Sequence, residues 1–259
     1  KYAEDLKVSL ERERWLSLEK KKMGAYIPKN VVEHISGREN PSLGGEMTRV
    51  TILFADIVDF DSLSEQLVPQ ETVEFLNVYM SEMGSIIDSQ DGILDKFIGN
   101  RIMAVFSETS KQHDHAARAV KAAVLMQEAI AHHRDKWGET IKLELSSVKI
   151  RIGINTGRVI AGNIGSVERM AYTVIGDNVN LAGIIEESCK AGHVLMNQTT
   201  YDDIRGNHEV RTMDPIYIKS RKRPIHTFDL VLNSNKHPQA ANSENEISRF
   251  WMMPDAEES

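Results

Sequence analysis

Residues 50–60 read VTILFADIVDF, and this stretch decides the fold. The run Val50–Ile57 is almost continuously apolar, which is typical of a strand buried in the middle of a sheet. Asp56 interrupts the run at its end, where a carboxylate has little structural reason to be. The sequence therefore predicts a central strand that ends in a functional side chain.

Two elements with clear signals follow this strand. Pro69–Asp91 is expected to be a helix, because apolar residues recur every three or four positions, a proline stands near the first turn and a glycine follows the end. Ile93–Ile98 and Arg101–Phe106 are expected to pair as a hairpin, because Gly-Asn between them is a tight-turn sequence.

The other expected elements continue the alternation of helices and strands. They are a loop at Arg38–Thr48, a helix at Ala116–Arg134, a strand from Val148 to Ile154, a helix at Val179–Lys190, a strand at Val194–Asn197, and a closing pair of Ile216–Ile218 with Thr227–Leu232. This order predicts an α+β fold of the ferredoxin-like kind, an antiparallel sheet with helices on one face.

The two ends of the chain differ from this middle. Lys1–Met23 is highly charged with irregular apolar spacing, so it is either a solvated helix or a linker helix that passes on a signal from upstream. Asn233–Ser248 is polar, and Phe250–Met253 either docks on the domain or a partner or has no docking role. The expected division is a linker at 1–25, one domain at 26–232 and a tail at 233–259. Because the chain begins with lysine rather than methionine, we expect a piece of a longer protein.

Composition excludes several classes of protein. The 259 residues are 41% hydrophobic and 27% charged, which suits one sizeable domain with extra segments, and the net charge of −7 argues against a nucleic-acid partner. The single cysteine, Cys189, excludes an intrachain disulfide and suits a reducing compartment; its apolar surroundings predict a buried thiol rather than a nucleophile. With no secretory signal and no apolar run of about 18 residues, the expected location is cytoplasmic, alone or as part of a larger membrane-bound protein.

Four segments together resemble the catalytic domain of class III adenylate and guanylate cyclases. They are VTILFADIVDF at Val50–Phe60, LDKFIGNRIMAVF at Leu94–Phe106, RIGINTGRVIAGNIGSVERMAYTVIGDNVNLA at Arg151–Ala182 and PIYIKSRKRP at Pro215–Pro224. The resemblance covers Tyr26 to Leu232. It implies a ferredoxin-like class III core, conversion of ATP to cAMP and pyrophosphate, a Mg²⁺ or Mn²⁺ cofactor, and a site shared by two head-to-tail subunits in a homodimer or heterodimer. An upstream sensor is a further partner that it implies.

The resemblance places a metal site at Asp56 and Asn100. The family usually has aspartate at both positions, and Asn100 arises either naturally or by an engineered change; asparagine also suits a tight turn. The pair carries one negative charge rather than two, so weakened binding of Mg²⁺ or Mn²⁺ is expected. Where the family has glycine, Asp59 either repels phosphate, supplies a substitute ligand or faces solvent. The backbone N–H groups expected to wrap the triphosphate are those of Ile57, Val58, Asp59 and Phe60.

Four further positions match the nucleotide-binding pattern of the family, and a fifth departs from it. Lys96 and Thr173 match the pair that reads the adenine edge, so ATP is favoured over GTP. Asn180 matches the asparagine that orients the ribose, and Lys219 matches a lysine that contacts the triphosphate. Ile184 stands where the family has an arginine that neutralises charge at the α-phosphate. Loss of such an arginine lowers phosphoryl-transfer rates by about 10³–10⁵-fold.

Three functional hypotheses follow. The leading one is a degenerate adenylate cyclase-like domain with little or no turnover, which binds ATP or a related nucleotide or transmits dimer geometry from a sensor. The first alternative is an active adenylate cyclase homodimer that uses Asp56 with Mn²⁺ or Mg²⁺ and a substitute ligand. The second alternative is an interaction module without nucleotide binding.

Overall fold

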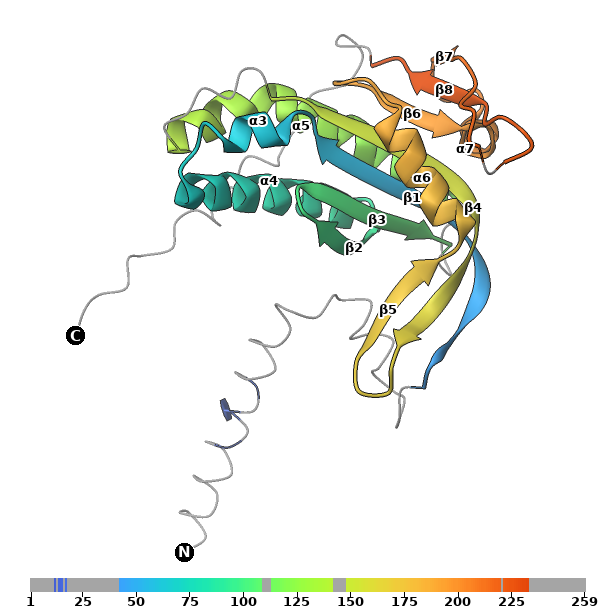
Figure 1. Cartoon of the computed structure of the whole chain (residues 1–259), viewed down its shortest axis with the longest axis horizontal. Coiled ribbons are helices and arrows are strands. Elements are labelled where there is room, and N and C mark those ends of the chain that lie inside the picture. The colour runs from blue at the N-terminus through green and yellow to red at the C-terminus, as the bar shows by residue number, and fades with distance from the viewer. Residues whose placement is uncertain are drawn as a thin grey trace, which may run out of the picture.

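The computed structural model describes residues 42–108, 113–141, 148–219 and 221–232, with four isolated positions between 12 and 17 (Figure 1). The expected linker at 1–25 and the expected tail at 233–259 lie outside these ranges, apart from those four positions. Within the described residues, no helix is both long and apolar enough to cross a bilayer.

One sheet of eight strands forms the centre of the molecule. The hydrogen-bonded order is β2-β3-β1-β4-β6-β8-β7, and β5 also pairs with β4. All pairs are antiparallel except β4 with β6. The strands are β1 (Gly44–Ile57), β2 (Ile93–Ile98), β3 (Arg101–Ser107), β4 (Ile150–Gly165), β5 (Met170–Ile175), β6 (Val194–Asn197), β7 (Val210–Thr212) and β8 (Thr227–Leu230).

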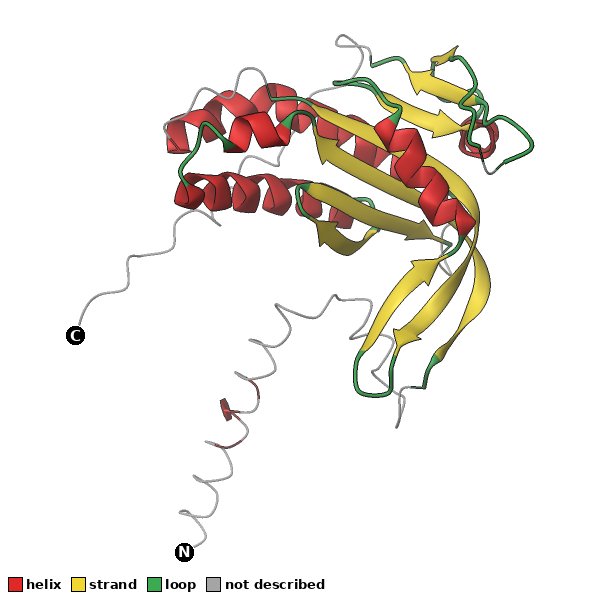
Figure 2. Ribbon diagram, viewed as in Figure 1, coloured by secondary structure: helices red, strands yellow, loops and turns green. Residues whose placement is uncertain are grey.

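Helices cover both faces of this sheet (Figure 2). They are α3 (Phe60–Ser64), α4 (Pro69–Ser89), α5 (His115–Ile141), α6 (Asp177–Glu187) and α7 (Gln198–Ile204). Leu53 and Ala55 of β1 belong to the large core cluster that includes α4 and α5, whereas Ile52 and Phe54 cluster with Ala182 of α6. The expectation of helices on one face is therefore wrong for α6. A strand that is apolar at nearly every position has two faces to bury, so it needs cover on both.

Most expected elements are present, with altered bounds. The central strand, the helix after it, the hairpin and the strand at Val194–Asn197 are confirmed. The expected loop at Arg38–Thr48 is wrong from Gly44 onward, because β1 begins there. In the expected closing pair, Ile216 instead forms an isolated bridge with Ile225, and β8 pairs with β6 and β7.

Strand β4 continues to Gly165, well beyond the expected end at Ile154. Its glycines interrupt the apolar alternation from which the shorter strand was inferred. At Gly153 the absence of a side chain is needed, because a Cβ atom there would overlap the backbone of Glu186 on α6. Gly153 thus allows α6 to lie directly on the sheet, which positions the residues that follow on that helix.

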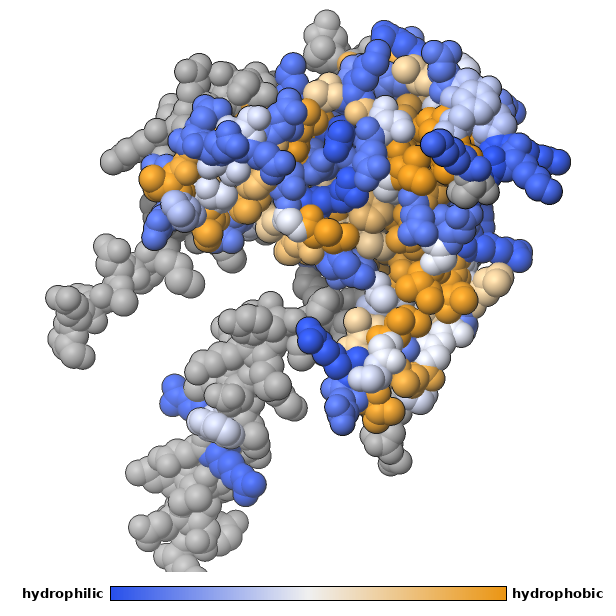
Figure 3. Space-filling model, viewed as in Figure 1, coloured by the Kyte–Doolittle hydropathy of each residue, from blue (hydrophilic) through white to orange (hydrophobic). Residues whose placement is uncertain are grey.

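The long strands β1 and β4 extend with β5 past the helical layers as a curved arm (Figure 2). Met47 lies opposite Ile160, and Ile160 lies opposite Ile175, so the three side chains form a row across the arm. They are 68%, 40% and 41% exposed. Apolar side chains are visible over this part of the molecule in Figure 3.

Candidate functional site

The end of β1 and the β2–β3 turn bring Asp56 and Asn100 into contact. Gly99 makes the turn with a φ of +63°, a conformation that glycine adopts without strain. The Asn100 side-chain nitrogen Nδ2 donates to Asp56 Oδ1 at 2.6 Å and to the Ile57 carbonyl at 3.1 Å. The amide therefore turns its nitrogen, not its oxygen, toward the carboxylate.

The second oxygen of Asp56 is also engaged. Arg151 lies opposite Asp56 in the β1–β4 register, and its guanidinium donates to Asp56 Oδ2 at 2.8 Å and to Glu186 Oε1 at 2.5 Å. Arg101 lies 2.8 Å from the other oxygen of Glu186. Two carboxylates and two guanidinium groups thus alternate in one network, defined here as the Asp56 network (Asp56, Arg151, Glu186 and Arg101), whose formal charges cancel.

Burial dominates the electrostatics of Glu186, whose side chain has no exposed surface. Burial raises the pKa of Glu186 to about 7, while Arg101 and Arg151 oppose the rise and Asp56 adds to it. The side chain reaches this position because Gly153 lets α6 approach β4 closely.

The donor set at Asp56 does not fit two divalent ions. Mg²⁺ and Mn²⁺ take oxygen ligands, usually carboxylates, carbonyls and water. Asp56 supplies one carboxylate, and both of its oxygens already accept from Asn100 and Arg151. Among the residues that the structure describes, no group of three or more His, Cys, Asp or Glu side chains is placed to hold a metal ion. Arg151 already supplies positive charge at this carboxylate.

The turn after β1 has a backbone conformation that suits the glycine which the family resemblance implies at position 59. Asp59 has a φ of 55°, in the left-handed region that aspartate tolerates better than most residues. Its side chain is exposed, and the residue forms the N-cap of α3. The Val58 N–H donates to the Lys149 carbonyl at 2.9 Å. Of the four backbone amides expected to wrap the triphosphate, that of Val58 is therefore already engaged within the chain.

A second polar group lies at the β2–β5 side of the site. Lys96 Nζ donates to Thr173 Oγ1 at 2.9 Å, so the two residues expected to read the base are in contact. Asp95, whose side chain is 3% exposed, lies 2.8 Å from the same ammonium and accepts from the Thr173 hydroxyl at 2.9 Å. Asp95 and Thr173 both line a cavity of about 210 Å³ with apolar walls that include Val50 and Val174. Lys96, Thr173 and Asp95 are together called the base triangle.

The remaining expected residues lie on α6 and on the β7–β8 connection. Asn180 is exposed and Ile184 is half-buried, one helical turn apart. Lys219 is exposed. An ion pair between Arg221 and Asp177 ties the connection that carries Lys219 to the first turn of α6. Among the described residues, no hydrogen bond or ion pair joins the base triangle to Asp56 or Asn100 within one chain.

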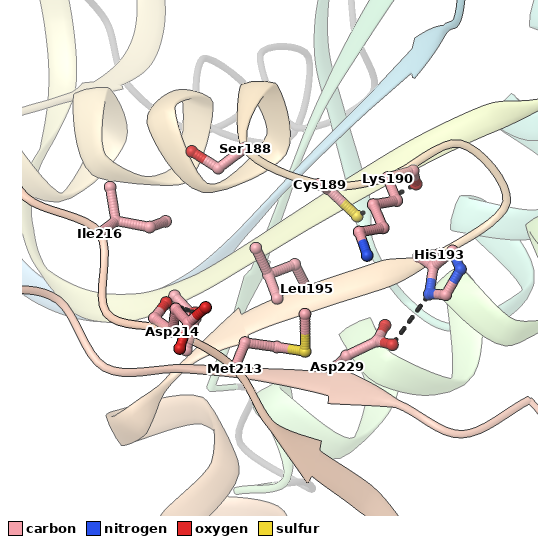
Figure 4. Close-up of a pocket in the computed structure, with 10 residues that line it drawn as sticks. Ser188, Cys189, Lys190, His193, Leu195, Met213, Asp214, Ile216 and Asp229 are labelled. Atoms are coloured by element: carbon pink, nitrogen blue, oxygen red, sulfur yellow. Dashed lines mark hydrogen bonds and ion pairs between the residues drawn. The ribbon is translucent and has the colours of Figure 1, made fainter.

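A further cavity, of about 240 Å³, lies between the end of α6, β6 and β8 (Figure 4). Cys189 lines it and is 7% exposed. The expectation of a buried cysteine is confirmed, and burial raises the pKa of this thiol to about 12. His193 Nδ1 lies 2.8 Å from Asp229 Oδ2 on the opposite wall. None of the residues expected in the nucleotide site lines this cavity.

Four polar residues that hold the site together were not predicted from the sequence: Asp95, Arg101, Arg151 and Glu186. Arg151 alternates with buried residues along its strand, a pattern that predicts a solvated side chain. Asp95 directly precedes Lys96, and adjacent residues of a regular strand point to opposite faces. The only available signal was the concentration of charged residues in segments already suspected of function.

Known proteins resemble this chain over most of the residues that the structure describes. The family model described as adenylate and guanylate cyclase catalytic domain matches residues 45–231. An adenylate cyclase of Anabaena cylindrica is 39% identical over 165 residues, covering 62% of this chain and 32% of that protein. The terminal-differentiation-specific adenylate cyclase of Dictyostelium discoideum is 34% identical over 203 residues, covering 76% of this chain and 9% of that protein. The chain thus spans about a tenth to a third of these relatives.

Solved structures resemble the chain over the same region. The adenylyl cyclase CyaB from P. aeruginosa superimposes with a TM-score of 0.70 at 32% identity, covering 76% of this chain and 100% of that one. The guanylyl cyclase Cya2 superimposes with a TM-score of 0.68 at 34% identity, covering 73% of this chain and 94% of that one. The expected α+β core is confirmed by these likenesses.

Proposed function

The chain belongs to the family of adenylate and guanylate cyclase catalytic domains, and from this premise we propose that it is an adenylate-type member that binds ATP but cyclises it slowly or not at all. Members of this family generally use Mg²⁺ or Mn²⁺ and bind nucleotide substrates. In this chain, base recognition is retained, whereas the ion-dependent chemistry is weakened.

The observation that carries the proposal is the state of Asp56. One oxygen accepts from the amide of Asn100 at 2.6 Å and the other from Arg151 at 2.8 Å. An ion that binds here competes with both donors for the same two oxygens, and it gains only one carboxylate. Cyclisation needs the ribose 3′ hydroxyl to attack the α-phosphate while pyrophosphate leaves, and its acceleration comes mainly from positioning and charge stabilisation. Because Arg151 already pairs with Asp56, this carboxylate has little negative charge left to hold the ions that would stabilise the transition state.

The helix α6 supports the same division. Asn180 is exposed and available to orient a ribose, but Ile184 one turn further presents an alkyl group. An alkyl side chain cannot donate a hydrogen bond to the α-phosphate. The transition state therefore gains no stabilisation from position 184.

The base triangle favours ATP over GTP. Lys96 presents an ammonium donor beside the hydroxyl of Thr173, the pairing expected of adenylate-type members. The triangle is held by three short contacts, so it is pre-organised before a nucleotide arrives. Retention of this arrangement favours a nucleotide-binding role over a pure interaction module.

A second copy of the chain, or another cyclase domain, is proposed as the partner in a head-to-tail dimer. Family members often dimerise, and the exposed row of Met47, Ile160 and Ile175 on the arm is a surface that a partner would bury. A regulatory role downstream of a sensor, transmitted through residues before 26, is part of the same proposal.

The experiment combines binding and turnover in one preparation. Purified chain at high concentration is titrated with a fluorescent ATP analogue, and cAMP formation from ATP is then measured with Mn²⁺ and with Mg²⁺. Binding with negligible cAMP supports the proposal. Robust cAMP formation that Asp56→Ala abolishes would establish an active adenylate cyclase instead. A folded dimer that binds no nucleotide would indicate an interaction module.

A further inference from the structure

Between Leu94 and Lys96, strand β2 has one residue more than the stretch of β3 with which it pairs, and that residue is Asp95. Leu94 and Lys96 lie opposite neighbouring residues of β3, so Asp95 forms a β-bulge between them. Successive residues of a regular strand point to opposite faces. The bulge instead brings both Asp95 and Lys96 to the hydroxyl of Thr173 on β5.

The protons of the base triangle can be counted. An ammonium only donates and an ionised carboxylate only accepts, so the direction of each bond is fixed. Thr173 Oγ1 accepts from Lys96 Nζ at 2.9 Å and donates its one proton to Asp95 Oδ2 at 2.9 Å. Lys96 Nζ also lies 2.8 Å from Asp95 Oδ2. Thr173 is left with one lone pair and no proton, and Lys96 is left with one proton.

We propose that Asp95 is a positioning residue for base specificity, which holds the Thr173 hydroxyl as a pure acceptor toward the nucleotide. This inference rests on the proposed function, because it assigns a role inside the nucleotide site. Asp95 is almost fully buried and lines the same cavity as Thr173. Without the carboxylate, the hydroxyl would rotate and serve either as donor or as acceptor.

The consequence concerns the 6-position of a purine. Adenine carries a 6-amino donor beside the N1 acceptor, whereas a 6-oxo purine carries an acceptor beside a protonated N1. A freely rotating hydroxyl satisfies either base by turning its proton. With that proton held by Asp95, Thr173 offers only a lone pair, which suits the amino group and leaves a 6-oxo group unpaired. Sites built on such hydrogen bonds reject the wrong partner because buried polar groups then lack a bond.

The test compares ATP with ITP, which differ only at the 6-position and in the protonation of N1. Affinities of the dimeric chain are measured by competition against a fluorescent ATP analogue. In wild type we expect ATP to bind more tightly than ITP. Asp95→Ala should lower the ratio of the two affinities about tenfold, the scale of one hydrogen bond to a charged or polarised group.

Four further variants make the readout specific. Asp95→Asn should retain the wild-type ratio, because the Lys96 ammonium holds the amide oxygen toward itself and toward Thr173. Thr173→Val should lower the ratio, and adding Asp95→Ala to it should lower it no further, since both act through one hydroxyl. Glu108→Ala removes another carboxylate from the same cavity and should change both affinities equally.

The outcomes separate this inference from the proposed function. If wild type prefers ATP and Asp95→Ala keeps the full preference, Asp95 has no part in specificity while nucleotide binding stands. If wild type binds neither nucleotide, both ideas fail together. Should Asp95→Ala not fold, Thr173→Val carries the test, and full discrimination by that variant overturns the proposal.

Discussion

The base triangle and the Asp56 network neutralise their buried carboxylates in different ways. In the base triangle, the one carboxylate of Asp95 holds a lysine and a hydroxyl, and one donor and one acceptor remain for a ligand. In the Asp56 network, each carboxylate faces guanidinium groups, and the amide of Asn100 takes a further acceptor site. The base triangle keeps hydrogen-bonding groups for a ligand, whereas the groups of the Asp56 network are paired within the chain.

Under the proposed function, recognition and chemistry depend on separate groups of residues in this fold. The base triangle lies on β2 and β5, whereas the Asp56 network lies on β1, β3, β4 and α6. The two groups share no residue, so we expect a change in one to leave the hydrogen bonds of the other intact. Substitutions can test how far this independence extends.

The largest effect is expected when both departures from the family pattern are reversed. Asn100→Asp with Ile184→Arg restores a second carboxylate and an α-phosphate donor, so cAMP formation should rise by about 10³-fold or more. The rate is measured with Mn²⁺ and ATP over a range of chain concentrations. Affinity for ATP should change far less than the rate, because the base triangle is untouched.

A matched control makes the same change of charge elsewhere. Asn207→Asp with Val73→Arg alters two exposed positions outside the site and should leave the rate unchanged. If the double revertant at Asn100 and Ile184 is as inactive as this control, the two substitutions are not the cause of slow turnover, and the contrast between the halves fails.

The next effect concerns the stability of the Asp56 network. Arg151→Ala removes the cation between Asp56 and Glu186, so the unfolding free energy should fall by about 2 to 4 kcal/mol. Urea unfolding measures the change. Arg158→Ala, an exposed arginine on the same strand, should stay within about 0.5 kcal/mol of wild type. Equal losses for both variants would show that the network contributes nothing to stability.

A smaller effect is expected in the base triangle. Lys96→Ala removes the free donor, so ATP affinity should fall about tenfold, as for one charge-assisted hydrogen bond. The loss of stability should be smaller than for Arg151→Ala, because Asp95 keeps its bond from Thr173. Lys121→Ala on α5 is the exposed control. An unchanged affinity would mean that this half does not read the base.

The smallest effect is a pH dependence of the unfolding free energy, which arises from Glu186 in the Asp56 network. The pKa of Glu186 is raised from 4.5 to about 7 by burial, so between these values the folded chain retains a proton that the unfolded chain has lost. The unfolding free energy should therefore fall, by about 1 kcal/mol or more, as pH rises through this window and level off above it.

Urea unfolding of wild type and Glu186→Gln across this pH range isolates the contribution. His115, whose pKa is lowered by burial and by Arg49, gives a slope of opposite sign, since its neutral folded form is lost as pH falls. Both proteins carry His115, so the difference between their profiles reports Glu186. Parallel profiles would show that Glu186 does not titrate in this range.

Sequence patterns predicted what depends on local periodicity. Local sequence predicted β1, the helix after it and the Gly99-Asn100 hairpin, because burial and turn type depend on neighbouring residues. The contact of Lys96 with Thr173 and the position of Asn100 beside Asp56 followed from the family resemblance. These are the parts of the site whose residues lie in long, ordered motifs.

Other features depend on contacts that no local pattern encodes. The extension of β4 beyond Ile154 was hidden by Gly157, where a Cβ atom would overlap the side chain of Asn178 on α6, a helix distant in sequence. Asp95 was missed because a bulge turns it to the face that alternation assigns only to its neighbour. Arg151 read as a solvated residue, although its partner Glu186 lies thirty-five residues away.

The register that places Arg151 opposite Asp56 also bears on how the domain is made. A small domain built around structural zinc is unfolded until its ion arrives, because metal binding supplies its folding free energy. Here the counter-charge for Asp56 is part of the polypeptide, synthesised with it and fixed by strand pairing. Asp56 therefore needs no divalent ion as its counter-charge during folding, and we expect newly synthesised chains to fold even in a cell starved of divalent ions.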